Sequence, residues 1–234
     1  MRIDWPVASA TSVLADSIRH WLTDFIASSV SPSWGEKETI IPPFGGGLTD
    51  GQGVVAHYGK LGMEQMIDEV RQAEADSFRI FGMSNELDVS LLCDTVGYLT
   101  MLSSYSVYSG GAHGGHFVSG ATFNKKNGHR WGWDMIDLSK REQLISLLRE
   151  GLRDYFEVKS DEEMAECLLL YDDPDTPEDE SATLPLPVTD PYLTATGVCF
   201  VYQQYEIAAY ALGLPSVEIP WAKIRPLLKQ GVLE

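Results

Sequence analysis

The hydrophobic positions near the start of the chain predict an amphipathic helix. Between residues 9 and 29 they recur at steps of three and four, which places them on one helical face. The same periodicity predicts a second helix over residues 63–81. Residues 31–62 include Pro42-Pro43 and Gly45-Gly46-Gly47, a composition that indicates a long loop or a lid between the two helices.

The middle of the chain has the composition of β-strands. Leu87–Cys93, Tyr98–Tyr108 and Phe117–Asn124 are rich in Val, Leu, Tyr and Thr. Asn127-Gly128 follows and predicts a type I′ hairpin turn, because Asn and Gly tolerate the positive φ that both central residues need. The return strand is predicted over residues 129–133.

The last third of the chain changes from helix to strand. Ser139 and Glu142 have the S-x-x-E spacing of a capping box, and so do Ser160 and Glu163, so each pair predicts the start of a helix. Short strands and a final short helix are then predicted over residues 192–196, 198–203, 217–219 and 222–229.

The order of these elements indicates the fold class. Strands occur in groups and helices do not alternate with them one for one, which favours an α+β fold with antiparallel sheets over a doubly wound fold. A hydrophobic fraction of 44% and a charged fraction of 22% are typical of a folded chain. Cys93, Cys167 and Cys199 are odd in number and lie in apolar surroundings, so we expect small buried hydrophobic residues rather than a closed disulfide set.

The net charge excludes two classes of function. The chain has 34 acidic residues against 17 Lys and Arg, a formal charge of −17. It lacks the basic stripe of a nucleic-acid-binding protein and the basic clusters that dock on anionic lipid. It also has no apolar run of about 18 residues that would span a membrane. Residues 157–180 carry much of the charge, with 11 acids and one base, and we expect a solvated acidic loop at 171–180.

A glycine-rich turn is the densest candidate for chemistry. Residues 105–116 place four glycines within six positions, beside His113 and His116. Together with His129, these histidines offer three imidazoles that could bind Zn²⁺. The favoured interpretation is a structural turn pinned by a hydrogen-bonded His113, because no HExxH motif or carboxylate partner has the spacing of a metal site.

Glu206 is the second candidate, because it stands among apolar residues. It is either an acid with a raised pKa or, as we favour, an acceptor of backbone N–H bonds at a turn. The chain contains no P-loop, no dinucleotide motif in the right context and no G-x-S-x-G nucleophile. No cofactor is therefore expected.

These two motifs also carry a resemblance to a known family. The stretch 108–114 (YSGGAHG), residues 122–124 and the turn 127–128 resemble the RsiV-like domain of unknown function. The likeness continues at 204–213 (QYEIAAYALG) and 217–221 (VEIPW), and it spans nearly the whole chain. Similar domains occur outside the cell in a lysozyme-sensing anti-sigma factor, at the N-terminus of some peptidoglycan deacetylases, and in bacterial envelope lipoproteins.

The resemblance implies an organisation and a location. It implies two closely packed subdomains, residues 1–126 and 127–234, with an acidic insertion at 171–190. It also implies an exported protein, in the periplasm or on the outer surface of a bacterium, whose leader has been removed. Composition alone leaves a cytoplasmic location open.

The same resemblance implies a non-catalytic binding or sensing module. Its partners would be a basic protein such as lysozyme, or peptidoglycan fragments, held in a groove near the glycine turn or the 31–62 segment. The expected binding residues are Tyr108, Gly110, Gly111, His113, Tyr205 and Glu206. The alternatives are a metal-dependent hydrolase or deacetylase acting on envelope polysaccharide through His113, His116 and His129, and a purely structural envelope protein.

Overall fold

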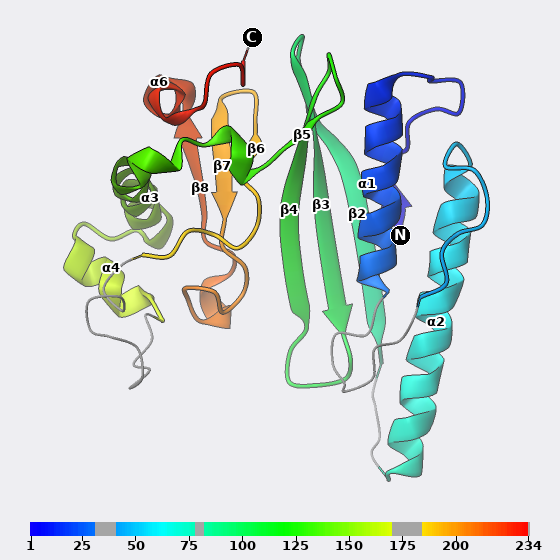
Figure 1. Ribbon diagram of the computed structural model, residues 1–234. Helices are drawn as coiled ribbons and strands as arrows, with labels where there is room; N and C mark the ends of the chain where they lie inside the picture. Colours follow the sequence, from blue (N-terminus) through cyan, green and yellow to red (C-terminus); the bar gives the residue numbers. More distant parts are fainter. Residues whose placement is uncertain (31–40, 78–81, 170–183, 234) are drawn as a thin grey trace. The chain divides into compact units, whose positions relative to one another are not determined.

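The fold combines helices with two mostly antiparallel sheets, as the order of elements predicted. The computed structural model describes residues 1–30, 41–77, 82–169 and 184–233. Residues 31–40, 78–81 and 170–183 lie outside the described residues, and the last range includes most of the acidic insertion predicted at 171–190. The helices and strands, traced in Figure 1, are β1 (Arg2–Ile3), α1 (Val13–Ser29), α2 (Gly51–Ala75), β2 (Ser84–Asp94), β3 (Tyr98–Tyr108), β4 (Gly115–Asn124), β5 (Arg130–Trp131), α3 (Arg141–Phe156), α4 (Asp161–Cys167), β6 (Tyr192–Leu193), β7 (Gly197–Val201), β8 (Ser216–Pro220) and α6 (Trp221–Ile224).

The chain forms two compact units whose segments interleave along the strands. One sheet has the strand order β1-β2-β3-β4-β5, with β1 parallel to β2, and the other has the order β6-β7-β8. Unit 1 comprises Met1–Leu91, Ser103–His116 and Phe123–Arg130, and unit 2 comprises Leu92–Leu102, Phe117–Thr122 and Trp131–Glu234. The predicted subdomain boundary at residue 126 stays a prediction.

Helix α1 ends at the predicted residue and begins four residues after the predicted start. The Ser12 hydroxyl accepts a hydrogen bond from the Ala15 N–H at 3.2 Å and caps the first turn. Ile18, Leu22 and Ile26 recur on one face and are buried. This face anchors the helix in unit 1 and leaves its other faces available for contacts with the hairpin or with solvent.

Helix α2 begins twelve residues before the predicted start, so the loop expected over residues 51–62 is wrong. Asp50 caps the helix by accepting from the Gly53 N–H at 2.9 Å. Two glycines within this helix, Gly51 and Gly62, are instead sites of close approach. A Cβ at Gly51 would lie 2.5 Å from the Trp5 ring, and one at Gly62 would lie 3.1 Å from Val30 Cγ1.

The hairpin between β4 and β5 is longer than a type I′ turn. The Asn124 N–H donates to the His129 carbonyl and the Gly128 N–H donates to the Asn124 carbonyl, each at 2.8 Å. The loop therefore has four residues, and only Gly128, with φ of 71°, has the left-handed conformation expected of both central residues. Asn127 contributes through its side chain instead, by accepting from the His129 N–H at 3.0 Å.

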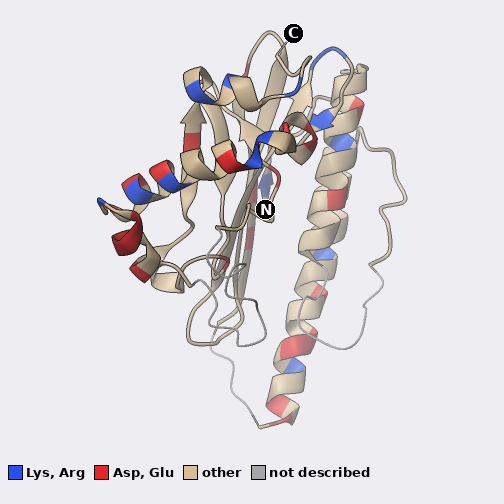
Figure 2. Cartoon of the chain, turned by 60° about the vertical axis from the view of Figure 1, so that its left-hand side comes forward, with Lys and Arg blue, Asp and Glu red and all other residues tan. Residues whose placement is uncertain are grey.

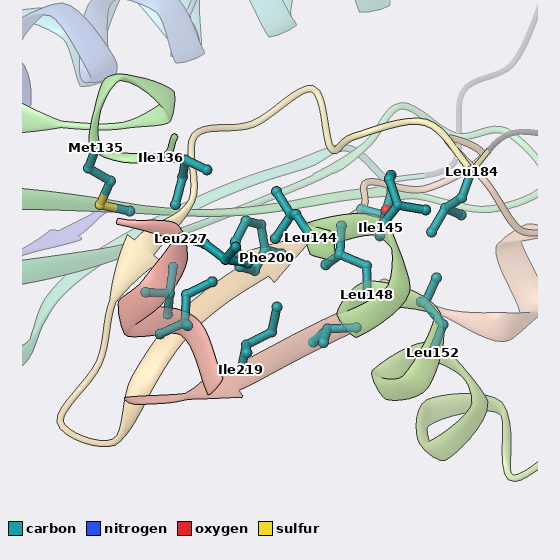
Figure 3. Close-up of a cluster of buried hydrophobic side chains, with 14 of the residues drawn as sticks. Met135, Ile136, Leu144, Ile145, Leu148, Leu152, Leu184, Phe200, Ile219 and Leu227 are labelled. Atoms are coloured by element: carbon teal, nitrogen blue, oxygen red, sulfur yellow. The ribbon is translucent and has the colours of Figure 1, made fainter. Parts of the chain in front are cut away.

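The core of unit 2 lies between α3 and the three-stranded sheet. Figure 3 shows side chains of α3 directed toward β7 and β8. Leu148 and Leu152 of α3, Phe200 of β7 and Ile219 of β8 are all 2% exposed or less. Gly151 permits this close packing, because a Cβ there would lie 2.2 Å from Val217 Cγ1.

Only one of the two predicted capping boxes begins a helix. The Ser160 hydroxyl accepts from the Glu163 N–H and caps α4, as predicted. Ser139 does not cap α3, which is preceded by a 3-10 turn, Leu138–Lys140. The carboxylate of Asp137 caps that turn by accepting from the Ser139 N–H at 3.2 Å. Asp has the same capping ability as Ser and lies two residues earlier, which is why the prediction failed.

Acidic side chains lie on the surface of both units. Figure 2 marks acidic residues along α2 in one unit and on α4 in the other.

Cys199 is buried as expected, but Cys93 and Cys167 are only partly buried. Among the described helices, none combines the length and the apolar character needed to cross a membrane.

Candidate functional site

The glycine-rich turn between β3 and β4 is held by two hydrogen bonds. The Tyr108 hydroxyl donates to the Gly111 carbonyl at 3.1 Å, and the His113 Nδ1–H donates to the Gly114 carbonyl at 2.9 Å. His113 is exposed and bonds within the fold, as predicted. Gly110 has a positive φ of 85°, whereas Gly111 does not, so the conformational demand falls on the first glycine of the pair.

The three histidines do not form a metal site in this structure. The His116 Nδ1 and the Ser106 Oγ are hydrogen-bonded at 2.8 Å. Across the described residues, no three His, Cys, Asp or Glu side chains are close enough together to hold a metal ion. The alternative of a site formed by His113, His116 and His129 is therefore not supported by the geometry.

Glu206 fixes the turn after β7 by accepting two backbone bonds. Its Oε1 accepts from the Val188 N–H and its Oε2 from the Gln203 N–H, each at 2.7 Å. Burial raises the pKa of the Glu206 carboxyl, and the two N–H bonds offset part of that rise. The prediction that this acid is partly buried and serves a turn is confirmed.

Tyr205 precedes Glu206 in the sequence and has a left-handed backbone conformation. Its φ is 64°, which is uncommon for a bulky residue and is held here by the bonds to Glu206 on its C-terminal side. The Tyr205 side chain is 48% exposed, and its ring lies 6.1 Å from the ring of Tyr210. The predicted binding residues thus form two groups, Tyr205 and Glu206 in unit 2 and the glycine turn in unit 1.

A groove beside α1 is the feature that sequence reasoning missed. It has a volume of about 810 Å³ and lies in unit 1, between α1 and the β4–β5 hairpin. The hairpin side is formed by Phe123, Gly128 and Arg130. The helix side includes Asp16, Ser17, His20, Trp21, Asp24 and Phe25.

Aromatic rings form one wall of this α1 groove. Trp21 stacks on Phe25, with centroids 5.6 Å apart and planes 19° apart. Trp21 also meets the buried ring of Phe123 edge-on at 5.8 Å. Both geometries are favourable for aromatic pairs, so Phe123 fixes Trp21, and Trp21 in turn fixes Phe25. Trp21 and Phe25 remain half-buried and present ring surface to the groove.

Polar side chains of α1 line the groove and are held in place by bonds to other groups of the same unit. The Asp16 carboxylate pairs with Nη1 of Arg19 at 3.0 Å, and Arg19 is only 1% exposed. Nη2 of Arg19 also donates to the Val7 carbonyl at 2.6 Å. The His20 Nδ1–H donates to the Asp16 carbonyl at 2.8 Å, which leaves Nε2 as the acceptor of the neutral ring. Asp16 and His20 are thus oriented before any ligand arrives.

The groove was missed because its residues were read as part of one apolar stripe. Trp21 and Phe25 have the spacing of core positions, but they are only half-buried. The signal that could have found the groove is a second periodicity of four residues. Asp16, His20 and Asp24 recur on one line along α1, and Ser17, Trp21 and Phe25 recur on the line beside it.

A second, smaller hollow borders the segment that was expected to contribute a groove. Its volume is about 490 Å³, and it lies between the N-terminal residues and the start of α2. Trp5, Thr49, Gln52 and Val55 are among its lining residues. The described part of the 31–62 segment therefore borders a concavity, although residues 51–62 are helical.

The comparisons with known proteins connect this fold to one family of unknown function. Residues 139–222, which run from the turn before α3 into α6, match the family described as "Protein of unknown function (DUF3298)". The matched region includes the Glu206 turn but not the α1 groove. No curated protein matches the chain.

Two solved structures share the fold. A member of the DUF3298 family from Bacteroides fragilis is similar with a TM-score of 0.71 and 20% identity, over 97% of this chain and 82% of that one. A DUF3298 family protein from Pseudomonas aeruginosa PAO1 is similar with a TM-score of 0.51 and 19% identity, over 68% of this chain and 67% of that one. At these identities the likeness concerns the fold alone.

Proposed function

We propose that this protein is a non-catalytic binding or sensing module of the bacterial cell envelope, related to RsiV-like domains. The observation that carries the proposal is the α1 groove. Its volume of about 810 Å³ lies within the usual range of ligand sites, and it combines aromatic surface with oriented polar groups. The sequence resemblance supports export to the periplasm or the outer surface.

The lining favours a cell-wall glycan as the ligand. Sugar rings present apolar C–H faces, which pack on aromatic rings such as Trp21 and Phe25. Their hydroxyl groups donate to carboxylates such as Asp16 and Asp24. The ion pair to the buried Arg19 side chain holds the exposed Asp16 carboxylate without filling the groove. Preorganisation of this kind reduces the entropy lost on binding.

A basic protein such as lysozyme is the second candidate, and the charge of the chain favours it. A net charge of −17 would steer a cationic protein toward the surface and raise the association rate. Such steering is screened over about 8 Å at physiological ionic strength, so the rate would fall with added salt. Binding to a glycan in the groove would depend much less on salt.

The test measures binding of soluble peptidoglycan fragments and of lysozyme to the whole chain. The groove variant is Asp24→Ala with Phe25→Ala. The matched control is Ile67→Ala with Asp68→Ala, which removes one large apolar and one acidic side chain from an exposed part of α2 in the same unit. We expect wild type and control to bind peptidoglycan fragments alike, and the groove variant to bind about tenfold more weakly.

Two results would overturn the proposal. One is that the wild-type chain binds neither peptidoglycan fragments nor lysozyme. The other is that the groove and control variants bind both as tightly as wild type does. Thermal unfolding of each variant shows whether a loss of binding arises from a loss of fold.

A further inference from the structure

The second half of helix α2 adds nothing to the buried core of unit 1. The buried residues of this helix are Val54, Tyr58 and Gly62, and none of residues 63–75 is buried. The C-cap of α1, Val30, meets α2 at Gly62, where a Cβ would lie 3.1 Å from Val30 Cγ1. Residues 63–75 continue for about 20 Å beyond this contact, and Figure 1 shows them running past the end of α1.

These residues carry an apolar stripe along one side of the helix. Met63, Met66, Val70 and Ala73 recur at steps of three, four and three residues. This is the spacing of the a and d positions along which two helices pack, and we refer to these four residues as the α2 seam. Most helices in proteins are stabilised by burying such a stripe, and unit 1 does not bury this one.

The α2 seam presents apolar surface on which another element can pack. The row of buried residues at four-residue steps in the first half of α2 continues into Met66 and Val70, which are only partly buried. Met63 is 55% exposed, and the neighbouring Ile67 is 42% exposed. Methionine side chains are flexible and adapt their shape to the surface that packs on them.

The charge on this half of α2 indicates the charge of what packs there. Residues 63–76 contain five acidic residues and one basic residue, Arg71. Arg71 pairs with Asp68 at 3.1 Å. Glu69 and Glu74 occupy the positions that flank the seam, and no described residue forms an ion pair with either of them. Residues at these flanking positions form ion pairs between helices, so Lys or Arg on a second helix would complement them.

We propose that residues 63–75 of α2 are the docking surface for an amphipathic helix of a partner protein, with Lys or Arg on either side of that helix's own apolar stripe. The apolar residues of the partner helix cover the α2 seam, and its basic residues pair with Glu69 and Glu74. The described lining of the α1 groove includes no residue of α2. The inference therefore goes beyond the proposed function and does not depend on the ligand of the groove.

A second copy of this chain fits the surface less well than a basic helix does. Two α2 helices that paired along the seam would bring Glu69 and Glu74 of one copy against acidic residues of the other. Like charges that face each other across an interface weaken it. The same residues attract a basic helix, and the net charge of −17 increases its rate of approach.

The experiment measures the binding of labelled helical peptides to the whole chain by fluorescence anisotropy. The probe is a peptide of about three heptads with Leu at the a and d positions and Lys at the e and g positions. One comparison peptide has Glu in place of Lys, and another has the composition of the probe in scrambled order. We expect the probe to bind about tenfold more tightly than either comparison peptide, with an affinity that falls as salt is added.

An apolar pair of substitutions tests whether the probe lies on the seam. Met63→Ser with Ile67→Ser removes exposed apolar surface and should weaken binding of the probe about tenfold. The control, Val96→Ser with Leu138→Ser, changes two other exposed apolar residues and should bind the probe as wild type does. Circular dichroism of each variant shows whether α2 remains helical.

A charge pair of substitutions tests the flanking positions without a change of shape. Glu69→Gln with Glu74→Gln should weaken binding of the probe and reduce its dependence on salt. The control is Glu142→Gln with Glu166→Gln, which removes two exposed acids of unit 2 and should leave the salt dependence unchanged.

The variants used to test the α1 groove give a crossed comparison. Asp24→Ala with Phe25→Ala should bind the probe as wild type does. Ile67→Ala with Asp68→Ala removes part of the α2 surface, so it should bind the probe more weakly while it retains binding of peptidoglycan fragments. A failure of this inference and a failure of the proposed function are therefore distinguishable.

Three results would overturn the inference. One is that the probe does not bind, or binds no more tightly than the comparison peptides do. Another is that both α2 pairs, Met63→Ser with Ile67→Ser and Glu69→Gln with Glu74→Gln, bind the probe as wild type does. The third is sedimentation of the wild-type chain as a dimer that Met63→Ser with Ile67→Ser converts to a monomer, which would assign the surface to a second copy.

Discussion

Gln203 pairs with Val118 as if its side-chain amide were a backbone peptide. Its Nε2 donates to the Val118 carbonyl at 2.9 Å, and its Oε1 accepts from the Val118 N–H at 3.1 Å. Val118 lies in β4, whose neighbour β5 has only two residues, so the amide supplies partners that a longer strand would have provided. Gln203 is 9% exposed, which keeps water from replacing it.

Removing this amide should destabilise the fold. Gln203→Leu leaves the Val118 N–H and carbonyl without partners, and we expect a loss of about 2–4 kcal/mol in the free energy of unfolding. Gln203→Glu keeps the acceptor but faces the Val118 carbonyl with a carboxylate, so it should also destabilise. Urea unfolding followed by circular dichroism measures both. A Gln203→Leu protein as stable as wild type would show that the paired bonds contribute nothing.

The two adjacent glycines of the β3–β4 turn should respond differently to a methyl group. Gly110→Ala places a Cβ on a residue with φ of 85° and should cost about 1–2 kcal/mol. Gly111→Ala meets no atom within 4 Å and has no positive φ, so its stability should be within about 0.5 kcal/mol of wild type. The comparison uses thermal unfolding of the two variants, and equal losses in both would contradict the assigned conformations.

Glu206 should make stability depend on pH in a defined direction. Burial raises its pKa above the unfolded value of about 4.5, so the folded protein binds this proton more tightly than the unfolded chain does. The resulting stabilisation is fully present below the unfolded pKa. It is lost as pH rises through the folded pKa.

The measurement is the free energy of unfolding of wild type and Glu206→Gln from about pH 4 to about pH 7. Wild type should lose stability relative to the variant across the lower part of this range. Glu142→Gln, which changes an exposed acid of the same unit, is the control and should track wild type. A difference between wild type and Glu206→Gln that stays constant, or that grows in favour of wild type as pH rises, would refute the assignment.

The two S-x-x-E motifs allow a comparison between a serine that caps a helix, Ser160, and one that does not, Ser139. Ser160→Ala removes the side-chain acceptor of the Glu163 N–H and should cost about 1 kcal/mol. Ser139→Ala removes only an exposed bond from Ser139 to Asp137 and should cost less than about 0.5 kcal/mol. Chemical denaturation of both variants tests the order, and a larger loss from Ser139→Ala would reverse the interpretation.

Sequence patterns predicted most elements because local signals and packing agree there. Strand β3 has the predicted bounds, and β2 and β4 lie within three residues of theirs at either end. The start of α2 was mispredicted because glycine indicates a loop when it is considered alone. Gly51 and Gly62 serve contacts with Trp5 and Val30, which are distant in sequence and invisible to a local pattern.

The sequence predicted the role of a candidate residue only where that role depends on its neighbours in the sequence. The apolar neighbours of Glu206 indicated that its carboxylate accepts backbone N–H bonds at a turn. The glycines around His113 indicated a turn held by a hydrogen bond from His113. The α1 groove depends on where the hairpin residues Phe123 and Arg130 meet the helix, and that contact is set by the fold. Sequence periodicity predicted the helix but did not show which of its faces would be only partly buried.

The most direct test of the binding function is a map of amide chemical-shift changes on the whole chain during titration with soluble peptidoglycan fragments. The account predicts changes concentrated on Asp16, His20, Trp21 and Phe25 of α1 and on Arg130 of the hairpin, saturating with a single binding constant. Residues of unit 2 such as Leu148 should remain unchanged. Changes confined to other surfaces, or no changes at saturating fragment concentrations, would contradict the assignment of the α1 groove as the binding site.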